Sequence, residues 1–150
     1  MSDLSVNKTA YLDFEILEEY EAGLVLTGAE VKSVRAKQMK LQGAFVHVRR
    51  GELCLKNAHI SPYKPADGEQ DPIRERKLLL HQNEILRLAA KKQQDRLTIV
   101  PISVYSKGPF IKIKIGLGRG KKAFEKRDTL KKKEINRTLR ERMKGSVRDE

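Results

Sequence analysis

The 150-residue sequence has a single cysteine, Cys54, so no disulfide can form within the chain, and a reducing compartment is expected. No apolar stretch approaches the roughly 20 residues that a membrane-spanning helix needs. The N-terminus also lacks the apolar run of a signal peptide. These absences favour a cytoplasmic protein that does not enter a membrane.

Residues that could support catalysis or bind a metal are equally few. His47 and Cys54 could form a nucleophile–base pair or supply two metal ligands, but a zinc site takes three or four protein ligands. His59 and His81 fall in other predicted elements, without ligand spacing. The acidic residues of the first strand alternate between its two faces, which argues against a shared magnesium site; they are Glu15, Glu18, Glu19 and Glu21. We therefore expect no enzyme activity, no metal and no cofactor.

The glycine-rich segment 116–122, GLGRGKK, resembles a phosphate-binding loop only superficially. A Walker loop needs Ser or Thr where Lys122 stands, and the third glycine of a dinucleotide fingerprint would fall at Lys121. The glycines would still let the backbone approach another molecule closely, and two lysines follow them. This favours contact with RNA phosphates over nucleotide hydrolysis, with a flexible exit from the folded domain as the alternative.

The net charge of +12 is concentrated in the last third of the chain. Residues 1–106 carry 16 basic and 14 acidic side chains, whereas residues 107–150 carry 16 basic and 6 acidic ones. Such segregation indicates a polyanionic partner, either nucleic acid or an anionic membrane. Beyond Asp128 the only apolar stripe is Ile135, Leu139 and Met143, without aromatics, which is too narrow for a membrane-surface helix. We expect this tail to be disordered or weakly held when free and helical on a polyanion, or else merely solubilising.

Alternation of apolar and polar residues predicts six short strands. They lie around residues 14–16, 24–26, 44–48, 53–55, 97–104 and 110–117. A turn is expected at Glu21-Ala22-Gly23. A second, at Arg50-Gly51, would form a hairpin in which His47 faces Cys54. Helices are predicted over residues 29–37 and from Arg74 to Ala89, the latter divided near His81, and a loop over residues 61–73.

Most connections between these strands are too short for parallel winding. We therefore predict a mainly β fold with flanking helices: a six-stranded antiparallel barrel of the oligonucleotide-binding (OB) type, followed by a basic C-terminal tail. The expected domains are an RNA-binding barrel over residues 1–127 and the tail over residues 128–150.

Seven short motifs occur in one order along residues 7 to about 140, and together they closely resemble the SsrA-binding protein family, also called small protein B. They are Asn7-Lys8-Thr9-Ala10, Glu21-Ala22-Gly23, Gly28-Ala29-Glu30-Val31-Lys32-Ser33, Asp71-Pro72-Ile73-Arg74-Glu75-Arg76-Lys77-Leu78-Leu79-Leu80, Lys112-Ile113-Lys114-Ile115-Gly116, Gly120-Lys121-Lys122 and Glu125-Lys126-Arg127.

The resemblance implies a bacterial, non-enzymatic protein that binds the tRNA-like domain of transfer-messenger RNA (tmRNA). It implies delivery of this RNA to stalled ribosomes for trans-translation and peptide tagging. The implied partners are tmRNA and the decoding region and message channel of the small ribosomal subunit, with the tail entering the empty channel as a helix. We expect a monomer when free. The alternative is a general single-stranded RNA or ribosome-binding module on the same barrel.

The resemblance also implies site residues. Those expected to bind RNA are Asn7, Lys8, Glu21, Ala22, Gly23, Lys32, Arg35, Arg76, Lys77, Leu79, Lys112, Lys114, Gly120, Lys121 and Lys122. Those expected to contact the ribosome are Phe124, Glu125, Lys126, Arg127, Lys131, Lys132, Lys133, Ile135, Leu139 and Met143. The family usually has Asp where Glu125 stands, and His or Tyr at Phe124; a phenyl ring stacks but cannot donate a hydrogen bond.

Overall fold

The computed structural model describes residues 3–64 and 70–148, with side chains through Met143. The predicted loop over residues 61–73 therefore falls partly outside the described residues, at Pro65 and Gly68. The chain divides into two units, Met1–Gly120 and Lys121–Glu150, and each is described by itself. None of the described helices is long and apolar enough to cross a membrane.

The first unit is a mainly β structure with helices at its flanks, as predicted. The described residues contain nine strands: β1 (Asp3–Val6), β2 (Phe14–Leu24), β3 (Met39–Lys40), β4 (Phe45–Arg49), β5 (Glu52–Lys56), β6 (His59–Ile60), β7 (Arg76–Leu79), β8 (Thr98–Lys107) and β9 (Phe110–Gly120). The helices of this unit are α1 (Ala10–Asp13), α2 (Gly28–Arg35) and α3 (Gln82–Asp95).

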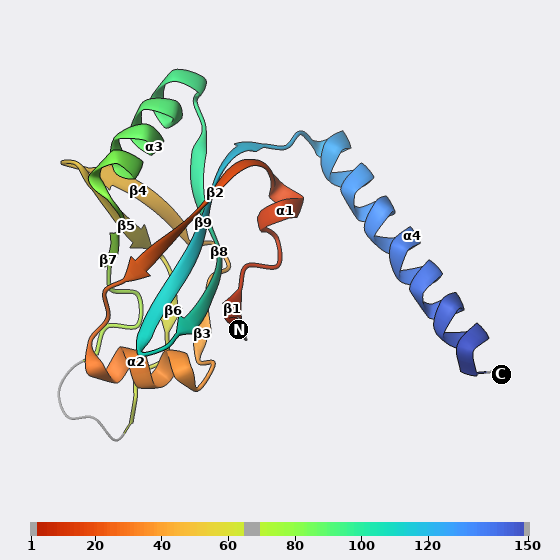
Figure 1. Cartoon of the computed structure of the whole chain (residues 1–150), viewed down its shortest axis with the longest axis horizontal. Coiled ribbons are helices and arrows are strands. Elements are labelled where there is room, and N and C mark those ends of the chain that lie inside the picture. The colour runs from red at the N-terminus through yellow and green to blue at the C-terminus, as the bar shows by residue number, and fades with distance from the viewer. Residues whose placement is uncertain (1–2, 65–69, 149–150) are drawn as a thin grey trace. The chain divides into compact units, whose positions relative to one another are not determined.

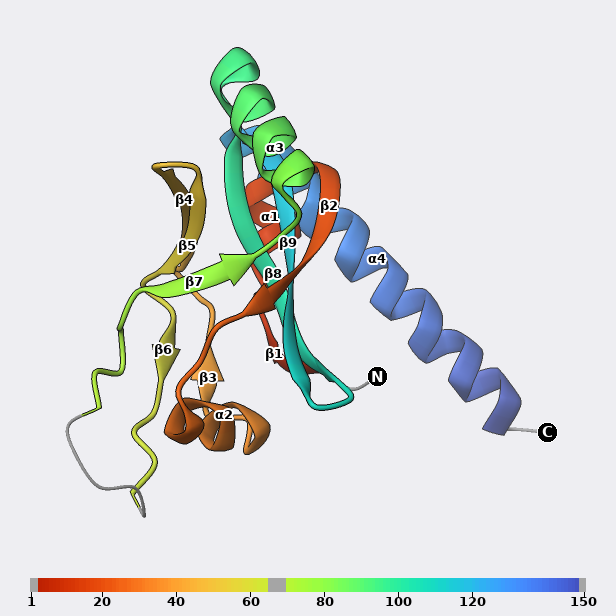
Figure 2. The same ribbon diagram turned by 60° about the vertical axis from the view of Figure 1, so that its left-hand side comes forward.

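Six of the strands close into an antiparallel ring. The sheet order is β1-β8-β4-β5-β7-β2-β9, and a further pairing of β8 with β9 closes the ring, while β1 pairs with β8 outside it. The short strands β3 and β6 form a separate two-stranded sheet. Figures 1 and 2 show α2 and α3 at opposite ends of this sheet structure. The ring has six members, the number that the sequence predicted, but not the same six: β2 joins the first two predicted strands into one, and β7 lies where a helix was predicted.

Apolar side chains that alternate along the ring strands form the core. Leu53, Leu55, Ile113 and Ile115 are fully buried, each at 0% exposure. On β9, Lys112 and Lys114 alternate with these isoleucines and lie on the partly exposed face. The period-2 pattern of a half-buried strand thus places the core on one face and the charges on the other.

The hairpin of β4 and β5 confirms the prediction made from Arg50-Gly51. Both turn residues have positive φ, 51° at Arg50 and 75° at Gly51, as a two-residue type I′ turn requires. The resulting register pairs His47 with Cys54.

The turn predicted at Glu21-Ala22-Gly23 is wrong, because β2 runs without interruption from Phe14 to Leu24. Gly23 pairs with Leu79 on one side and with Lys112 on the other. A Cβ at this position would lie 3.3 Å from the Cβ of Leu79. Gly23 therefore permits close packing between two strands and does not end one.

The helix predicted to begin at Arg74 is also wrong over its first part. Residues 76–79 form strand β7, in which burial alternates from Arg76 to Leu79, and helix α3 begins only at Gln82. Three consecutive leucines fit either period, and β7 is fixed by pairing with β5 and β2 on its two sides. The predicted break near His81 marks the true start of the helix.

Two glycines of β9 allow close packing against neighbouring strands. A Cβ on Gly116 would lie 2.9 Å from Cδ1 of Ile102, and one on Gly118 would lie 3.1 Å from the backbone oxygen of Glu15. Both glycines are buried, so their backbones approach neighbouring strands and not an external ligand. Only Gly120 of this series opens onto free space.

The second unit contains helix α4 (Ala123–Arg148). Its large apolar side chains lie at least half exposed: Phe124, Leu130, Ile135, Leu139 and Met143. The predicted boundary after residue 127 and the predicted disorder of the free tail stay predictions.

Candidate RNA interface

A row of three predicted RNA-binding residues crosses the outer face of the ring. Leu79 on β7 pairs with Gly23 on β2, and Gly23 pairs with Lys112 on β9. Leu79 is 55% exposed, although two of its neighbours in sequence, Leu78 and Leu80, lie inward or half-buried. The row therefore places an exposed apolar side chain and a lysine on either side of a residue without a side chain.

Glu21 lies two residues from Gly23 on the same face of β2. Its carboxylate accepts hydrogen bonds from the hydroxyl of Tyr105 and from Nζ of Lys107, the latter at 3.3 Å. The Tyr105 hydroxyl and Lys107 hold the pKa of Glu21 below its usual value. Burial, followed by Glu21 itself, raises the pKa of Tyr105. Glu21 is thus an ionised acceptor in a fixed position, able to accept from base amino and imino groups.

An aromatic residue that was not predicted to bind RNA lies beside this row. Phe110 is 64% exposed, and its ring centroid lies 5.6 Å from Nζ of Lys112. A shallow pocket of about 280 Å³ lies between Leu79 and Phe110, with Pro109, Val31 and Lys112 in its walls. An exposed aromatic next to lysines is a suitable platform for an unstacked base. Its position at the start of β9, after the Gly108-Pro109 turn, was the available signal.

The two predicted basic residues of α2 have different neighbours. Arg35 donates to the backbone oxygen of Pro109 at 3.3 Å, which brings it to the turn before Phe110. Pro109 also lines the pocket between Leu79 and Phe110. Lys32 lies over the ring of Tyr63, 5.4 Å from its centroid, and no contact among the described residues joins it to the row.

Arg76 has a structural role, and its burial excludes the contact with RNA that the sequence led us to expect. Its side chain is fully buried and donates to Glu30 Oε2 at 2.6–2.8 Å and to the Ala58 backbone oxygen at 2.7 Å. Ala22 is buried as well, at 1% exposure. Since RNA cannot reach a buried side chain, neither residue belongs to the surface proposed below.

Glu30 is the centre of that buried cluster and also caps α2. Its Oε1 accepts from Arg74 at 2.6 Å and from the backbone N–H of Thr27 at 3.0 Å. Burial opposes ionisation, but the bonds from Arg74, Thr27 and Arg76 outweigh it and lower the pKa of Glu30 to about 2. The cluster therefore fixes α2 against the segment that leads into β7.

Asn7 and Lys8 lie at a separate hollow of about 420 Å³, lined also by residues 39–42. The Asn7 amide donates to the Pro101 backbone oxygen at 2.9 Å, and its Oδ1 accepts from the Thr9 backbone and hydroxyl. The Asn7 side chain is thus committed to the fold, whereas Lys8 is exposed.

Two further lysines that were predicted to bind RNA, Lys77 and Lys114, have acidic neighbours. Lys77 pairs with Glu52 at 3.0 Å, and Lys114 lies 3.8 Å from Glu19. All four side chains are between 41% and 53% exposed, so these pairs are weak and can exchange for phosphate at little cost.

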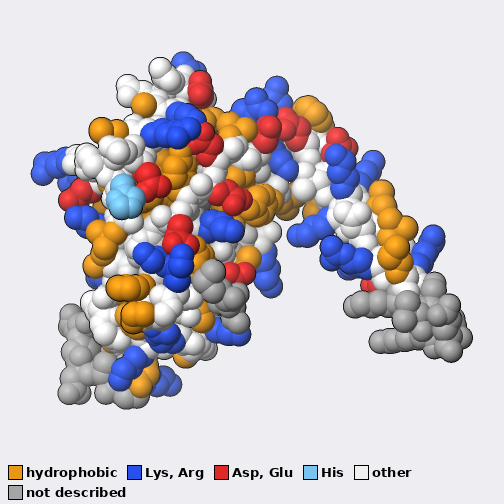
Figure 3. Space-filling model, in the orientation of Figure 1, with side chains coloured by type: hydrophobic (Ala, Val, Ile, Leu, Met, Phe, Trp, Pro, Cys, Tyr) orange, Lys and Arg blue, Asp and Glu red, His pale blue; other side chains and the backbone are white. Residues whose placement is uncertain are grey.

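The second unit carries the other predicted site residues. Nζ of Lys121 donates to the Thr129 hydroxyl at 2.7 Å, within the first turns of α4. Lys131, Lys132 and Lys133 are exposed, whereas Glu125 and Lys126 are half-buried. Figure 3 shows basic side chains along this helix beside a band of hydrophobic ones. The three residues of the predicted stripe, Ile135, Leu139 and Met143, are all exposed.

Comparison with known proteins gives one consistent result. A family model described as "SmpB protein" matches residues 4–145. An SsrA-binding protein of Persephonella marina is 46% identical over 146 residues, 97% of this chain and 96% of that protein. One of Latilactobacillus sakei is 50% identical over 137 residues, 91% of this chain and 88% of that protein. A solved structure described as "tmRNA-SmpB: a journey to the center of the bacterial ribosome" matches with a TM-score of 0.65 and 48% identity, over 79% of this chain and 84% of that one.

Proposed function

Since the chain belongs to the SmpB family, we propose that it binds tmRNA and takes it to stalled ribosomes for trans-translation. The observation that carries this proposal is the similarity to SsrA-binding proteins along nearly the whole chain. The surface around Glu21, Leu79 and Lys112 supports it, because it combines the kinds of group that read an RNA fold.

We propose three roles on this surface. Lys112 and Lys114 bind backbone phosphates, which position the RNA without reading its sequence. Glu21 accepts hydrogen bonds from base edges, a contact that phosphate-seeking lysines cannot make. Leu79 and Phe110 pack against a splayed base over the pocket that they line.

The closed ring of six antiparallel strands supports an OB-like barrel as the RNA-binding domain. We propose that α4 is the ribosome-contacting element. Its exposed lysines suit ribosomal RNA, and its exposed apolar stripe suits a partner present only on the ribosome. The helix has no core of its own, so a partner that covers the stripe and neutralises the lysines would stabilise it most.

We propose no catalytic role for the protein. The Glu21 carboxylate accepts hydrogen bonds from both Tyr105 and Lys107, an arrangement suited to binding and not to catalysis. Work on the ribosome would also place the protein in the cytoplasm.

Sequencing the RNA that co-purifies with the full chain tests the proposal. We expect one dominant RNA with a tRNA-like end. The matched control is Glu21→Ala combined with Lys112→Ala, which should lose that RNA while it keeps the ring folded. A broad mixture of RNAs, equal in both proteins, would instead support a general single-stranded RNA-binding module.

A further inference from the structure

Three side chains with metal-binding atoms meet on the outer face of the β4–β5 hairpin. The donor atoms of His47, Cys54 and Glu75 all lie within 4.8 Å of one another. The sequence pattern paired only His47 with Cys54, and two ligands are too few for zinc. Glu75 is far from both in the sequence, and the fold supplies it as a third ligand.

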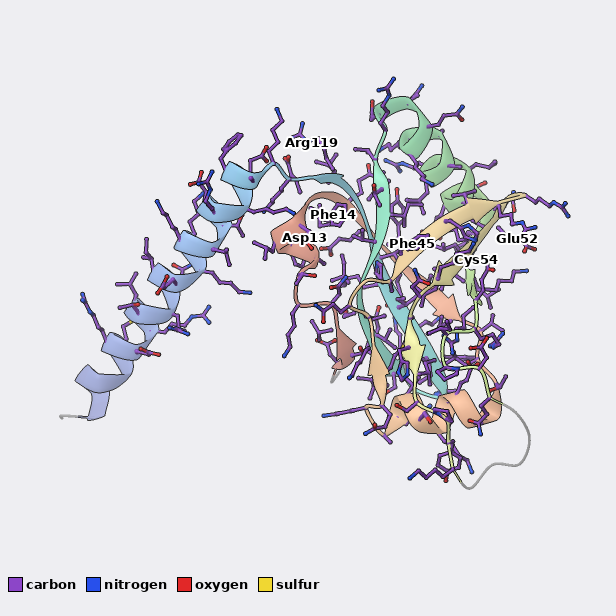
Figure 4. All side chains as sticks on the ribbon, turned by 180° about the vertical axis from the view of Figure 1, so that it is seen from behind. Asp13, Phe14, Phe45, Glu52, Cys54 and Arg119 are labelled. Carbon is purple, nitrogen blue, oxygen red and sulfur yellow. The ribbon has the colours of Figure 1, made fainter. Side chains whose placement is uncertain are left out.

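The strand register explains why these residues converge. Cys54 on β5 faces His47 on β4 and Lys77 on β7. Glu75 precedes Lys77 by two residues, so it lies on the same outer face. Figure 4 shows Cys54 on this hairpin, with Glu52 nearer to its turn.

Glu75 is held in place from both sides along the chain. The residues before and after it, Arg74 and Arg76, both bond to the buried carboxylate of Glu30. These bonds fix the backbone at Glu75 without using its own side chain. That side chain turns to the hairpin, where Oε1 lies 2.7 Å from Nε2 of His47.

The donor set has the chemistry of a zinc site. A thiolate, an imidazole and a carboxylate are the three side-chain ligands that Zn²⁺ takes, and the two anions neutralise the dication. The site is open enough for an ion and a water molecule, because the His47 and Glu75 side chains are 21% and 39% exposed. Lys77, which faces Cys54 in the strand register, has its ammonium group paired with Glu52 at 3.0 Å.

We propose that His47, Cys54 and Glu75 bind one zinc ion, with water as the fourth ligand. On binding, the Cys54 thiol loses its proton to solvent, and the ion replaces the hydrogen bonds that now join the three side chains. The ion then links β4 and β5 to the segment that enters β7. This proposal replaces the expectation of no metal, and it does not depend on RNA binding.

Metal titration of the purified full chain tests the proposal. After treatment with a chelator, the protein is titrated with ZnCl₂ by calorimetry and with CoCl₂ by absorption spectroscopy, since cobalt bound to a thiolate gives a charge-transfer band. We expect one zinc per chain and a cobalt–thiolate band in the wild type. Cys54→Ser, His47→Gln and Glu75→Gln should each weaken zinc binding by more than about 100-fold. Loss of a residue that only hydrogen-bonds to a metal ligand weakens metal binding by about 100-fold at most, so a larger effect indicates a direct ligand.

Two variants serve as matched controls: Glu52→Gln on the same hairpin, and His81→Gln at the start of α3. Both should bind zinc as the wild type does. Absence of the cobalt–thiolate band from the wild type would overturn the proposal whether or not any variant folds. Zinc binding of equal strength in the Cys54→Ser variant, with its fold verified by circular dichroism, would overturn it as well.

Discussion

Many large apolar side chains of the ring unit are fully buried, such as Leu53, Ile99 and Ile115, whereas every large apolar side chain described in α4 is at least half exposed. The charges differ in the same direction. Residues 1–120 carry 20 basic and 14 acidic side chains, and residues 121–150 carry 12 basic and 6 acidic ones. Each unit therefore has a net charge of +6, but the second unit is only a quarter as long as the first. The ring is stabilised by its own core, and the helix presents a surface that only a partner could cover. The two units should therefore respond separately to mutation.

Truncation after Asp128 should separate RNA binding from peptide tagging more completely than any other change. Peptide tagging on stalled ribosomes should be lost, while RNA affinity stays near the wild-type value, because Glu21, Leu79 and Lys112 all remain. The free energy of unfolding of the ring should change by no more than about 0.5 kcal/mol. Tagging and RNA binding are measured side by side on one preparation. If RNA binding falls together with tagging, α4 belongs to the RNA-binding surface and the comparison fails.

Glu30→Gln should produce the largest loss of stability in the ring. Removal of this carboxylate leaves Arg76 charged and buried without its partner, which costs about 3–5 kcal/mol. Urea unfolding of the full chain measures the loss. Glu52→Gln is the control, because it breaks the exposed pair with Lys77 and should cost about 1 kcal/mol or less. Equal losses in the two variants would contradict a structural role for Arg76.

Leu139→Pro tests the helix alone. A proline in the interior of α4 should cost about 3 kcal/mol of helix stability and should abolish tagging, with no effect on the unfolding of the ring. Leu139→Ala is the matched control, since it keeps the helix but removes an exposed apolar side chain. Circular dichroism and tagging assays report the two effects. Survival of tagging in both variants would make α4 a solubilising appendage.

Acid should weaken the ring through Glu30. A folded-state pKa of about 2, against an ordinary 4.5, means that the carboxylate contributes stability above about pH 4.5 and loses it as the pH falls toward 2. The contribution is roughly 3 kcal/mol at neutral pH. The difference in unfolding free energy between the wild type and Glu30→Gln should therefore shrink across that window. A constant difference down to pH 2.5 would show that Glu30 is not the titrating group.

Within the ring surface, Glu21→Ala and Lys112→Ala should each weaken RNA binding by roughly 1–3 kcal/mol. Loss of Lys112 removes a phosphate contact and should also reduce the salt dependence of binding, whereas loss of Glu21 should leave that slope nearly unaltered. Lys92→Ala in α3 is a control lysine outside the row. Identical salt slopes in the Glu21 and Lys112 variants would remove the proposed division of roles.

Local patterns predicted the parts of the fold that local chemistry determines. The Arg50-Gly51 turn fixed one hairpin because two consecutive positive φ values suit few residues. The same logic failed at Gly23, where the glycine serves a contact with Leu79 that no local pattern reveals. It failed again at residues 76–79, where leucine repeats fit two periods and pairing with distant strands decided between them.

The candidate site shows the same limit. Glu21, Leu79 and Lys112 were named from motifs, but their adjacency depends on the register of three strands distant in sequence. Arg76 was assigned to RNA because a basic residue in a motif is normally exposed, and only the fold reveals its burial against Glu30. Phe110, Tyr105 and Glu75 were missed for the complementary reason: each acquires its neighbours through tertiary contacts.

The pairing of β8 with β9 has a consequence for how partners can be recognised. Strand β9, which carries Lys112 and Lys114, is paired with β2 on one side and with β8 on the other along nearly its whole length. Strand addition, a common means of protein–protein recognition, is therefore closed to β9. A partner must recognise this strand by its side chains, which can be replaced one at a time without reopening the sheet.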